Sequence, residues 1–216
     1  MDADTLELIL RSRPTILEVL ENRGYNVDSY KNISPQEVKK LATSSTGLLK
    51  IQANKVEGGP APMDRIVVLY WLDTVRLRID SLVTNLWDSA LGGETYNPEK
   101  EEIMIMLNEP ENIVFDTQAV KQWIGHKARI CFFQLKQLVN NPAKHTFVYP
   151  HRKLSPEECD TVVKSLRLKS RQELPRIVYH VDIQARILGL VPGDIVEISR
   201  SSETSGVYKV YRLCSI

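Results

Sequence analysis

Residues 65–72 read Arg-Ile-Val-Val-Leu-Tyr-Trp-Leu, a near-continuous apolar run that is typical of a strand covered on both faces. Residues 102–107 (Glu-Ile-Met-Ile-Met-Leu) and 128–135 carry two further runs of this kind. Between the three runs lie amphipathic patterns over residues 75–91 and 117–124, which we interpret as helices. This order and these lengths predict βαβ units in a small mixed α/β sheet flanked by helices.

Upstream of this core, the sequence predicts helices followed by one strand. Residues 6–20 carry apolar positions at helical spacing, and Gly24 suits the left-handed end of that helix. We expect Pro14 to interrupt the helix or to begin a second one. Residues 34–37 (Ser-Pro-Gln-Glu) form a capping box that starts another helix, and residues 48–55 are expected to form a strand.

A domain boundary is expected at residues 140–143 (Asn-Asn-Pro-Ala), where the pattern of apolar and polar residues along the chain changes. It separates an N-terminal α/β domain, residues 1–143, from a C-terminal α+β domain, residues 144–216. The net charge of +1 hides an asymmetry, because the first part carries a formal charge of −3 and the second +4. Neither part has the charge of an autonomous nucleic-acid binder, whose affinity comes mainly from neutralised phosphates.

The composition favours an ordinary globular protein, since 43% of the residues are hydrophobic and 25% are charged. No stretch reaches the roughly 18 apolar residues that a membrane helix needs. The N-terminus lacks a signal-peptide pattern, so we expect a soluble intracellular protein without membrane contact. The three cysteines lie far apart, which predicts reduced, buried thiols and no zinc site. Neither GxGxxG nor GxxxxGK[ST] occurs, so no nucleotide cofactor is predicted.

The C-terminal part predicts short elements around two alternating strands. A second capping box, Ser-Pro-Glu-Glu, stands at residues 155–158. Residues 174–177 (Leu-Pro-Arg-Ile) are expected to be extended, since proline restricts the residue before it. Residues 194–200 and 207–213 alternate between apolar and polar, as half-buried strands do. Residues 203–206 (Glu-Thr-Ser-Gly) suit a hairpin turn better than a catalytic or phosphate-binding loop.

These short motifs follow one another in an order that is specific when taken together. They are Pro150-His151, the helix start at 155–158, Leu174-Pro175-Arg176-Ile177, Leu188-Gly189-Leu190, residues 193–198, residues 200–206 and Tyr211-Arg212-Leu213. In this order they resemble the assembly domain of the fifth common subunit of nuclear RNA polymerases and its shorter counterpart in archaeal polymerases. Arg23-Gly24-Tyr25 also resembles an Arg-Gly-Tyr motif of the cellular subunits.

The resemblance implies a non-catalytic subunit of a multisubunit DNA-directed RNA polymerase, with no cofactor and no metal. In a hetero-oligomer of this kind, the C-terminal domain would anchor to the largest subunit, among other polymerase subunits. The N-terminal domain would form part of the jaw near downstream duplex DNA. The protein would lie in the nucleus, or in the virion or at a cytoplasmic viral replication site if the diverged sequence is viral.

The resemblance also implies which residues face partners. The expected partner-interface residues are Leu174, Pro175, Arg176, Ile177, Arg200, Ser202, Glu203, Thr204, Gly206, Tyr211 and Arg212. The expected DNA-proximal residues are Thr117, Gln118 and Lys121, with weak or indirect contact because Glu109, Glu111 and Asp116 would repel phosphate. Three positions that are typically positive in the family are apolar here, at Val191, Pro192 and Val207, which puts the electrostatic contacts of those positions in doubt.

Two other classes of function stay open at this point. Asp80, Glu101 and Glu102 could form the acidic centre of a nuclease-like α/β enzyme. The chain could also be a free-standing nucleic-acid-binding protein. The segment 174–177 could be an ordinary link between elements rather than a docking segment.

Overall fold

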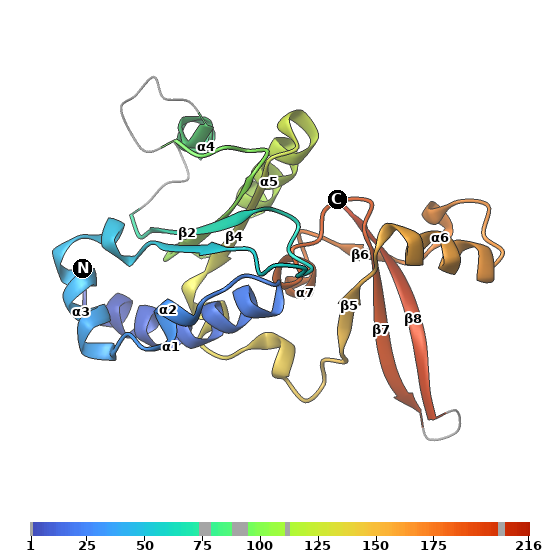
Figure 1. The fold of residues 1–216 in the computed structure, drawn as a ribbon, viewed down its shortest axis with the longest axis horizontal. Helices are drawn as coiled ribbons and strands as arrows, with labels where there is room; N and C mark the ends of the chain where they lie inside the picture. Colours follow the sequence, from blue (N-terminus) through green and yellow to red (C-terminus); the bar gives the residue numbers. More distant parts are fainter. Residues whose placement is uncertain (1, 74–78, 88–94, 111–112, 203–205) are drawn as a thin grey trace. The chain divides into compact units, whose positions relative to one another are not determined.

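The computed structural model describes residues 2–73, 79–87, 95–110, 113–202 and 206–216 (Figure 1). The chain divides into two compact units, Met1–Asn141 and Pro142–Ile216. Among the described residues, no helix is both long enough and apolar enough to cross a membrane.

The first unit is built on a four-stranded mixed sheet in the order β1-β2-β3-β4. Its strands are β1 (Ile51–Asn54), β2 (Arg65–Trp71), β3 (Glu101–Leu107) and β4 (Arg129–Gln134). β1 runs antiparallel to β2, whereas β2, β3 and β4 are mutually parallel. Every residue of β3 is buried, as its apolar run predicts for a central strand covered on both faces.

Helices cover both faces of this sheet. Figure 1 shows α1 on one side and α4 and α5 on the other, so the apolar strands are shielded from water on both sides. The helices are α1 (Ala3–Asn22), α2 (Asp28–Lys31), α3 (Pro35–Ser44), α4 (Ile79–Trp87) and α5 (Ile113–His126), with 3-10 turns at Thr46–Leu49 and Leu135–Leu138. The small mixed α/β sheet flanked by helices is confirmed. Part of the helix predicted over residues 75–91 lies outside the described residues.

Helix α1 runs without a break through Pro14, so the expected interruption there is wrong. A proline inside a helix costs about 3 kcal/mol, because it lacks the N–H for one backbone hydrogen bond and its ring crowds the preceding turn. Ile9, Ile16 and Leu20 are completely buried on the inner face of α1. Burying each such side chain contributes about 1.5–3 kcal/mol, so tertiary packing outweighs the local penalty.

The second unit is a four-stranded mixed sheet in the order β5-β7-β8-β6. Its strands are β5 (His151–Lys153), β6 (Arg176–Val178), β7 (Ile195–Ser202) and β8 (Gly206–Ser215). β7 pairs antiparallel with β5 and β8, and β6 pairs in parallel with β8. The predicted α+β architecture is confirmed for this unit.

A small core holds the helix of the second unit against its sheet. α6 (Pro156–Ser165) begins at the predicted capping box, in which Ser155 Oγ accepts the Glu158 N–H at 3.2 Å. The buried core residues are Leu154, Cys159, Val162, Leu174 and Ile195. The remaining elements are the short helix α7 (Ile183–Ile187) and 3-10 turns at Pro142–Lys144 and Arg171–Glu173. The whole unit spans only 75 residues, Pro142–Ile216, so a partner surface can raise its stability appreciably.

The end of α1 is fixed by the backbone of Gly24. The Gly24 N–H donates to the Glu21 carbonyl at 2.9 Å, and the Tyr25 N–H donates to the Leu20 carbonyl at 3.1 Å. This pairing needs a left-handed residue, and Gly24 has φ +93°. A Cβ on Gly24 would also lie 2.7 Å from the Cδ of Pro60. The position therefore requires glycine for its conformation and for its close contact.

A buried ion pair joins this helix end to the central strand. Arg23 Nη1 lies 2.7 Å from Glu102 Oε1, and the two side chains are only 4% and 3% exposed. The hydroxyl of Tyr25 donates to Glu102 Oε2 at 3.1 Å. The Arg23 guanidinium also contacts Cys131 Sγ on β4, at 3.9 and 4.0 Å. The network thus connects α1 with both β3 and β4.

Charge and burial shift the pKa values within this network. Burial alone would lower the pKa of Arg23, but the negative charge of Glu102 and the contact with Cys131 raise it above its usual value. Burial raises the pKa of Tyr25, and Glu102 raises it further. Arg23 therefore stays charged and Tyr25 stays protonated, so each remains a donor to the same carboxylate.

Substituting Glu102→Ala should lower the free energy of unfolding of the first unit by about 3–5 kcal/mol, because a buried guanidinium would lose its partner. The three tryptophans, Trp71, Trp87 and Trp123, all lie in this unit, so urea unfolding followed by tryptophan fluorescence measures it selectively. Glu7→Ala serves as the control.

The Glu7–Arg11 pair is 3.4 Å long and its side chains are 66% and 57% exposed, so its loss should cost no more than about 0.5 kcal/mol. Equal losses in the two variants would show that the buried pair does not stabilise the unit.

Candidate partner interface

Part of the β7–β8 hairpin extends beyond the rest of its sheet. β5 pairs only with residues 196–198 of β7, and β6 pairs only with residues 213–215 of β8. Residues 199–202 and 206–209 pair with each other and with no further strand among the described residues. We call this two-stranded segment the ribbon; Figure 1 shows β7 and β8 continuing together past the ends of β5 and β6.

Two tyrosines and an arginine share one face of the ribbon. Arg200 lies opposite Tyr208 in the strand register, so their side chains leave the same face. The Arg200 guanidinium lies over the ring of Tyr149, 5.4 Å from its centroid. Both tyrosine rings remain partly exposed, and Val207 on the other face is 72% exposed. Exposed aromatic and arginine side chains of this kind are the residue types that dominate protein–protein interfaces.

A buried carboxylate anchors the root of the ribbon. Glu197 accepts a hydrogen bond from the Tyr211 hydroxyl at 3.4 Å. It also pairs with Lys209 at 3.2 Å and with Arg152 at 3.4 Å. Burial raises the pKa of Tyr211, and the charge of Glu197 adds to that rise. Tyr211, expected at the partner interface, is therefore engaged within the unit through its hydroxyl.

The segment 174–177 leads into β6 at the edge of the sheet. Leu174 and Ile177 are buried, whereas Pro175 and Arg176 are exposed. The Pro175 carbonyl accepts the Leu213 N–H at 2.8 Å. The Arg176 carbonyl accepts a hydrogen bond from Arg212 Nη1 at 3.0 Å. A partner at this edge would meet Pro175 and Arg176, while the other two side chains support the fold.

The tip of the hairpin is only partly described. Ser202 lies opposite Gly206, which has φ +68°. Of the expected interface residues, Glu203 and Thr204 lie outside the described residues. The antiparallel register on either side of them is that of a hairpin, as predicted for this stretch.

The expected DNA-proximal residues lie on α5 and face different ways. Thr117 and Lys121 are exposed, whereas Gln118 is buried. Asp116 is also buried, within the first turn of α5, so it is turned away from any phosphate outside. That placement suits an acidic residue, because the helix dipole is positive at this end. Of the other two acids expected to repel phosphate, Glu109 is half-buried and Glu111 lies outside the described residues.

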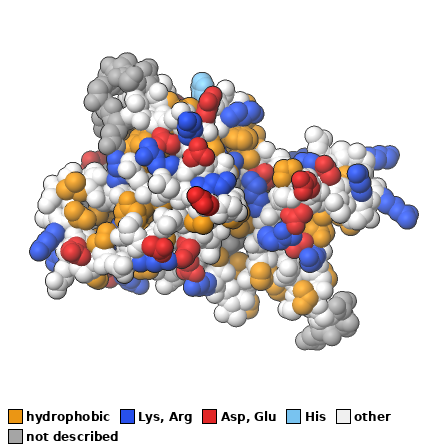
Figure 2. Space-filling view, in the orientation of Figure 1, with side chains coloured by type: hydrophobic (Ala, Val, Ile, Leu, Met, Phe, Trp, Pro, Cys, Tyr) orange, Lys and Arg blue, Asp and Glu red, His pale blue; other side chains and the backbone are white. Residues whose placement is uncertain are grey.

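Basic side chains do not gather on the visible face of the first unit. Figure 2 shows acidic and basic side chains interspersed there rather than segregated. At the end of α5, Lys127 and Arg129 lie over the ring of Trp123, 5.1 and 5.5 Å from its centroid. These placements give weak support to a free-standing nucleic-acid binder, which needs a concentrated positive surface.

Two of the three acidic residues of the nuclease-like alternative are held by structural contacts, whereas Asp80 is exposed on α4. Glu102 is held by Arg23 and Tyr25, as described above. Glu101 accepts from Arg65 Nε at 2.6 Å and from the Asn97 N–H at 2.6 Å. Within the described part of the chain, no group of three His, Cys, Asp or Glu side chains is placed to hold a metal ion. All three cysteines are buried free thiols, as predicted, and burial raises the pKa of Cys214 to about 12.

The sequence of this chain is similar to those of known RNA polymerase subunits. The family profile described as "RNA polymerase Rpb5, C-terminal domain" matches residues 140–214. The subunit named "DNA-directed RNA polymerases I, II, and III subunit rpabc1" of Dictyostelium discoideum is 27% identical over 212 residues, which cover 98% of this chain and 99% of the relative. The corresponding subunit of Caenorhabditis briggsae is 29% identical over 229 residues, covering 99% of each chain.

A shorter archaeal relative matches the second unit more strongly. "DNA-directed RNA polymerase subunit Rpo5" of Pyrococcus abyssi is 44% identical over 73 residues, which cover 34% of this chain and 87% of the relative. These relatives define the class of protein as a subunit of a multisubunit RNA polymerase. The chain belongs to the Rpb5 family of such subunits, as a diverged member with an archaeal Rpo5-like C-terminal part.

The family resemblance and the non-catalytic role as a polymerase subunit are thereby confirmed. None of the relatives named above is viral, so they give no support to a viral lineage or to a place in a virion. Sequence reasoning missed Tyr149 and Tyr208 as companions of Arg200. The alternation over residues 207–213 could have indicated Tyr208, but only once the register with β7 was known.

Proposed function

We propose that the second unit anchors this chain to the largest subunit of a DNA-directed RNA polymerase, and that the ribbon is part of the contact. The observation that carries this proposal is that the ribbon has no neighbouring strand among the described residues. An isolated two-stranded hairpin is marginally stable in water, so a partner surface against either face would stabilise it.

Arg200 is the most specific feature of that contact. Its Nε is buried and has no hydrogen-bond partner among the described residues, while its guanidinium lies over Tyr149. A planar guanidinium fixed on an aromatic ring is preorganised to bind a carboxylate or a backbone carbonyl. Exposed Tyr208 would supply apolar area beside it, and exposed Val207 would do so on the other face of the ribbon. The exposed Pro175 and Arg176 at the sheet edge offer a second point of contact.

The first unit is proposed to form part of the jaw around downstream duplex DNA, within a hetero-oligomer in the nucleus. Its full-length similarity to eukaryotic subunits of RNA polymerases I, II and III supports this role. Thr117 and Lys121 are the expected DNA-proximal side chains that α5 exposes. One lysine and one hydroxyl would give weak contact with the phosphate backbone and little sequence preference.

The anchoring role can be tested by purifying the tagged chain from its native source. The two large polymerase subunits should be recovered with the tagged chain at equal stoichiometry. The double substitution Arg200→Ala with Tyr208→Ala should reduce their recovery at least about tenfold, because interface arginine and tyrosine side chains each contribute about 2 kcal/mol or more.

Lys164→Ala is the matched control, since Lys164 is exposed on α6 and makes no part of the ribbon. The melting temperature of each isolated variant should stay close to that of the unsubstituted chain. Unchanged recovery with the double variant would contradict docking through the ribbon. A monomer with metal-dependent nuclease activity would contradict the polymerase role itself.

The proposed DNA contact can be tested with a photo-reactive maleimide on Thr117→Cys. The native cysteines are buried, so the introduced thiol should be labelled selectively. In a transcribing polymerase, the probe at 117 should crosslink to downstream DNA because α5 would face the duplex. Lys40→Cys on α3 provides an exposed control on another helix. Equal crosslinking from both positions, or none from 117, would exclude α5 as the DNA-facing element.

A further inference from the structure

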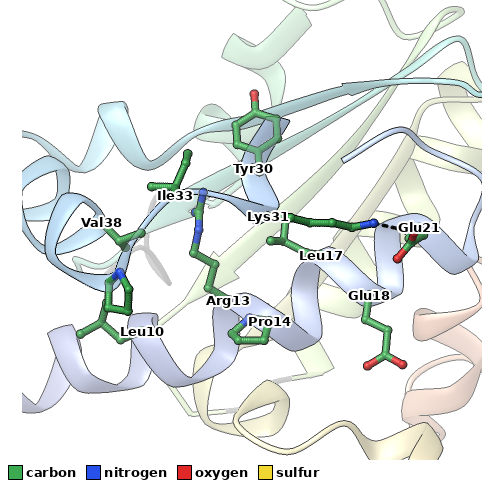
Figure 3. A pocket seen from close by; sticks show the side chains of 11 residues that line it. Leu10, Arg13, Pro14, Leu17, Glu18, Glu21, Tyr30, Lys31, Ile33 and Val38 are labelled. Atoms are coloured by element: carbon green, nitrogen blue, oxygen red, sulfur yellow. Dashed lines mark hydrogen bonds and ion pairs between the residues drawn. The ribbon is translucent and has the colours of Figure 1, made fainter. Parts of the chain in front are cut away.

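A pocket of about 300 Å³ lies in the first unit between α1 and the segment of residues 30–38 (Figure 3). Its apolar walls are formed by Leu10, Pro14, Leu17, Ile33, Pro35 and Val38. The polymerase role described above makes no use of this pocket, and it lies on α1 rather than on α5 or the ribbon.

Arg13 is the most buried of the four charged side chains that line the pocket, the others being Glu18, Glu21 and Lys31. Arg13 is only 7% exposed, and its Nε is buried without a hydrogen-bond partner among the described residues. Figure 3 shows Arg13 extending from α1 toward Tyr30 and Ile33. Its guanidinium lies over the ring of Tyr30, 5.9 Å from the centroid. Among the described residues, no carboxylate forms an ion pair with it.

A second tyrosine lies close to Arg13 on the buried side. Burial raises the pKa of the Tyr70 hydroxyl, and the nearby charge of Arg13 partly offsets that rise. Because the pKa stays above its usual value, Tyr70 remains a neutral phenol. It therefore brings no negative charge to balance the guanidinium.

The other charged side chains around the pocket already have partners, and Glu18 Oε2 accepts a hydrogen bond from Asn141 Nδ2 at 3.0 Å. Lys31 lies 2.7 Å from Glu21 and 3.0 Å from Asp28. Figure 3 shows the pairing of Lys31 with Glu21 at one end of the pocket, away from Arg13. The hydroxyl of Tyr30 donates to the Gln52 carbonyl at 3.1 Å and accepts the Gln52 N–H at 2.9 Å. The position of the Tyr30 ring is therefore fixed by its hydrogen bonds to Gln52. Arg13 is the lining residue whose Nε still needs an acceptor, so it is the group that can bind a ligand.

The Arg13 Nε in this position destabilises the free protein, because a buried N–H without an acceptor has lost its hydration. Proteins normally bury arginine only when it is paired, so an arginine in an apolar pocket indicates a missing acceptor. A carboxylate fits best, since the guanidinium matches it with two parallel hydrogen bonds. The apolar walls add a requirement for a hydrocarbon side chain next to that carboxylate.

We propose that this pocket binds a peptide segment of a partner protein, in which an apolar side chain fills the cavity and an adjacent carboxylate pairs with Arg13. The volume is at the lower limit of pockets that enclose small molecules, about 300 Å³, which favours one or two inserted side chains over a whole cofactor. Aromatic or aliphatic anchors seated in such pockets, with a charged neighbour, carry most of the energy of many interfaces.

The test uses the full chain and two matched pools of blocked peptides, Ac-Ala-Xaa-Glu-Ala-NH2 and Ac-Ala-Xaa-Gln-Ala-NH2, in which Xaa is Leu, Phe, Met or Val. The glutamate pool should cause saturable shifts in the amide NMR signals of α1 and of residues 30–38. The glutamine pool should bind at least about tenfold more weakly, because it cannot form a charge-assisted pair with Arg13.

Arg13→Met keeps the apolar stem and removes the charge, so it should abolish the preference for the glutamate pool. It should also leave the melting temperature unchanged or raise it, because an unpaired buried charge is removed. Arg11→Met is the control, since Arg11 is exposed on the same helix and does not line the pocket.

Equal binding of the two pools, or no binding of either, would overturn the proposal. A large fall in melting temperature for Arg13→Met would assign Arg13 to the fold instead. N-acetylleucine serves as a third probe. If it binds while the glutamate pool does not, the pocket takes small carboxylates rather than a protein segment, and the proposed partner is wrong.

Discussion

The buried pair between Arg23 and Glu102 is the constraint on which the first unit depends. It lies where α1 ends and joins that end to the central strand, whose neighbours β2 and β4 run parallel to it. The backbone next to Arg23 is also hydrogen-bonded. The Gly24 carbonyl accepts the Val56 N–H at 2.9 Å, and Tyr25 forms a β-bridge with Lys55. One charged contact therefore sets the position of the helix against the strands and the loop that follows β1.

This use of charge also explains how the protein can act without chemistry of its own. The carboxylates of Glu101 and Glu102 are held by arginines, and burial raises the pKa values of Cys159 and Cys214. What remains accessible is suited to contact: the exposed residues of α5, the edge of β6 and the ribbon. In the second unit the ribbon extends beyond the rest of the sheet, so the proposed partner would complete the structure as well as bind it.

Local rules predicted local features of this fold well. The capping boxes at Ser34 and Ser155 and the left-handed Gly24 depend on neighbouring residues, which the sequence displays directly. Pro14 was wrongly expected to break α1, because the buried face that stabilises this helix is a tertiary property. The inward orientation of Gln118, Leu174 and Ile177 likewise needs three-dimensional packing. Short motifs identified the family, but they did not separate the residues that bind partners from those that support the fold.

Hydrogen–deuterium exchange tests the central claim, that the ribbon docks on a polymerase partner, most directly. Exchange would be compared between the free chain and the chain within the purified polymerase. The account predicts strong new protection at residues 199–202 and 206–209 on assembly, with unchanged slow exchange in the fully buried β3. Ribbon amides that exchange equally fast in both states would contradict it, and would assign the anchoring contact to another surface of the second unit.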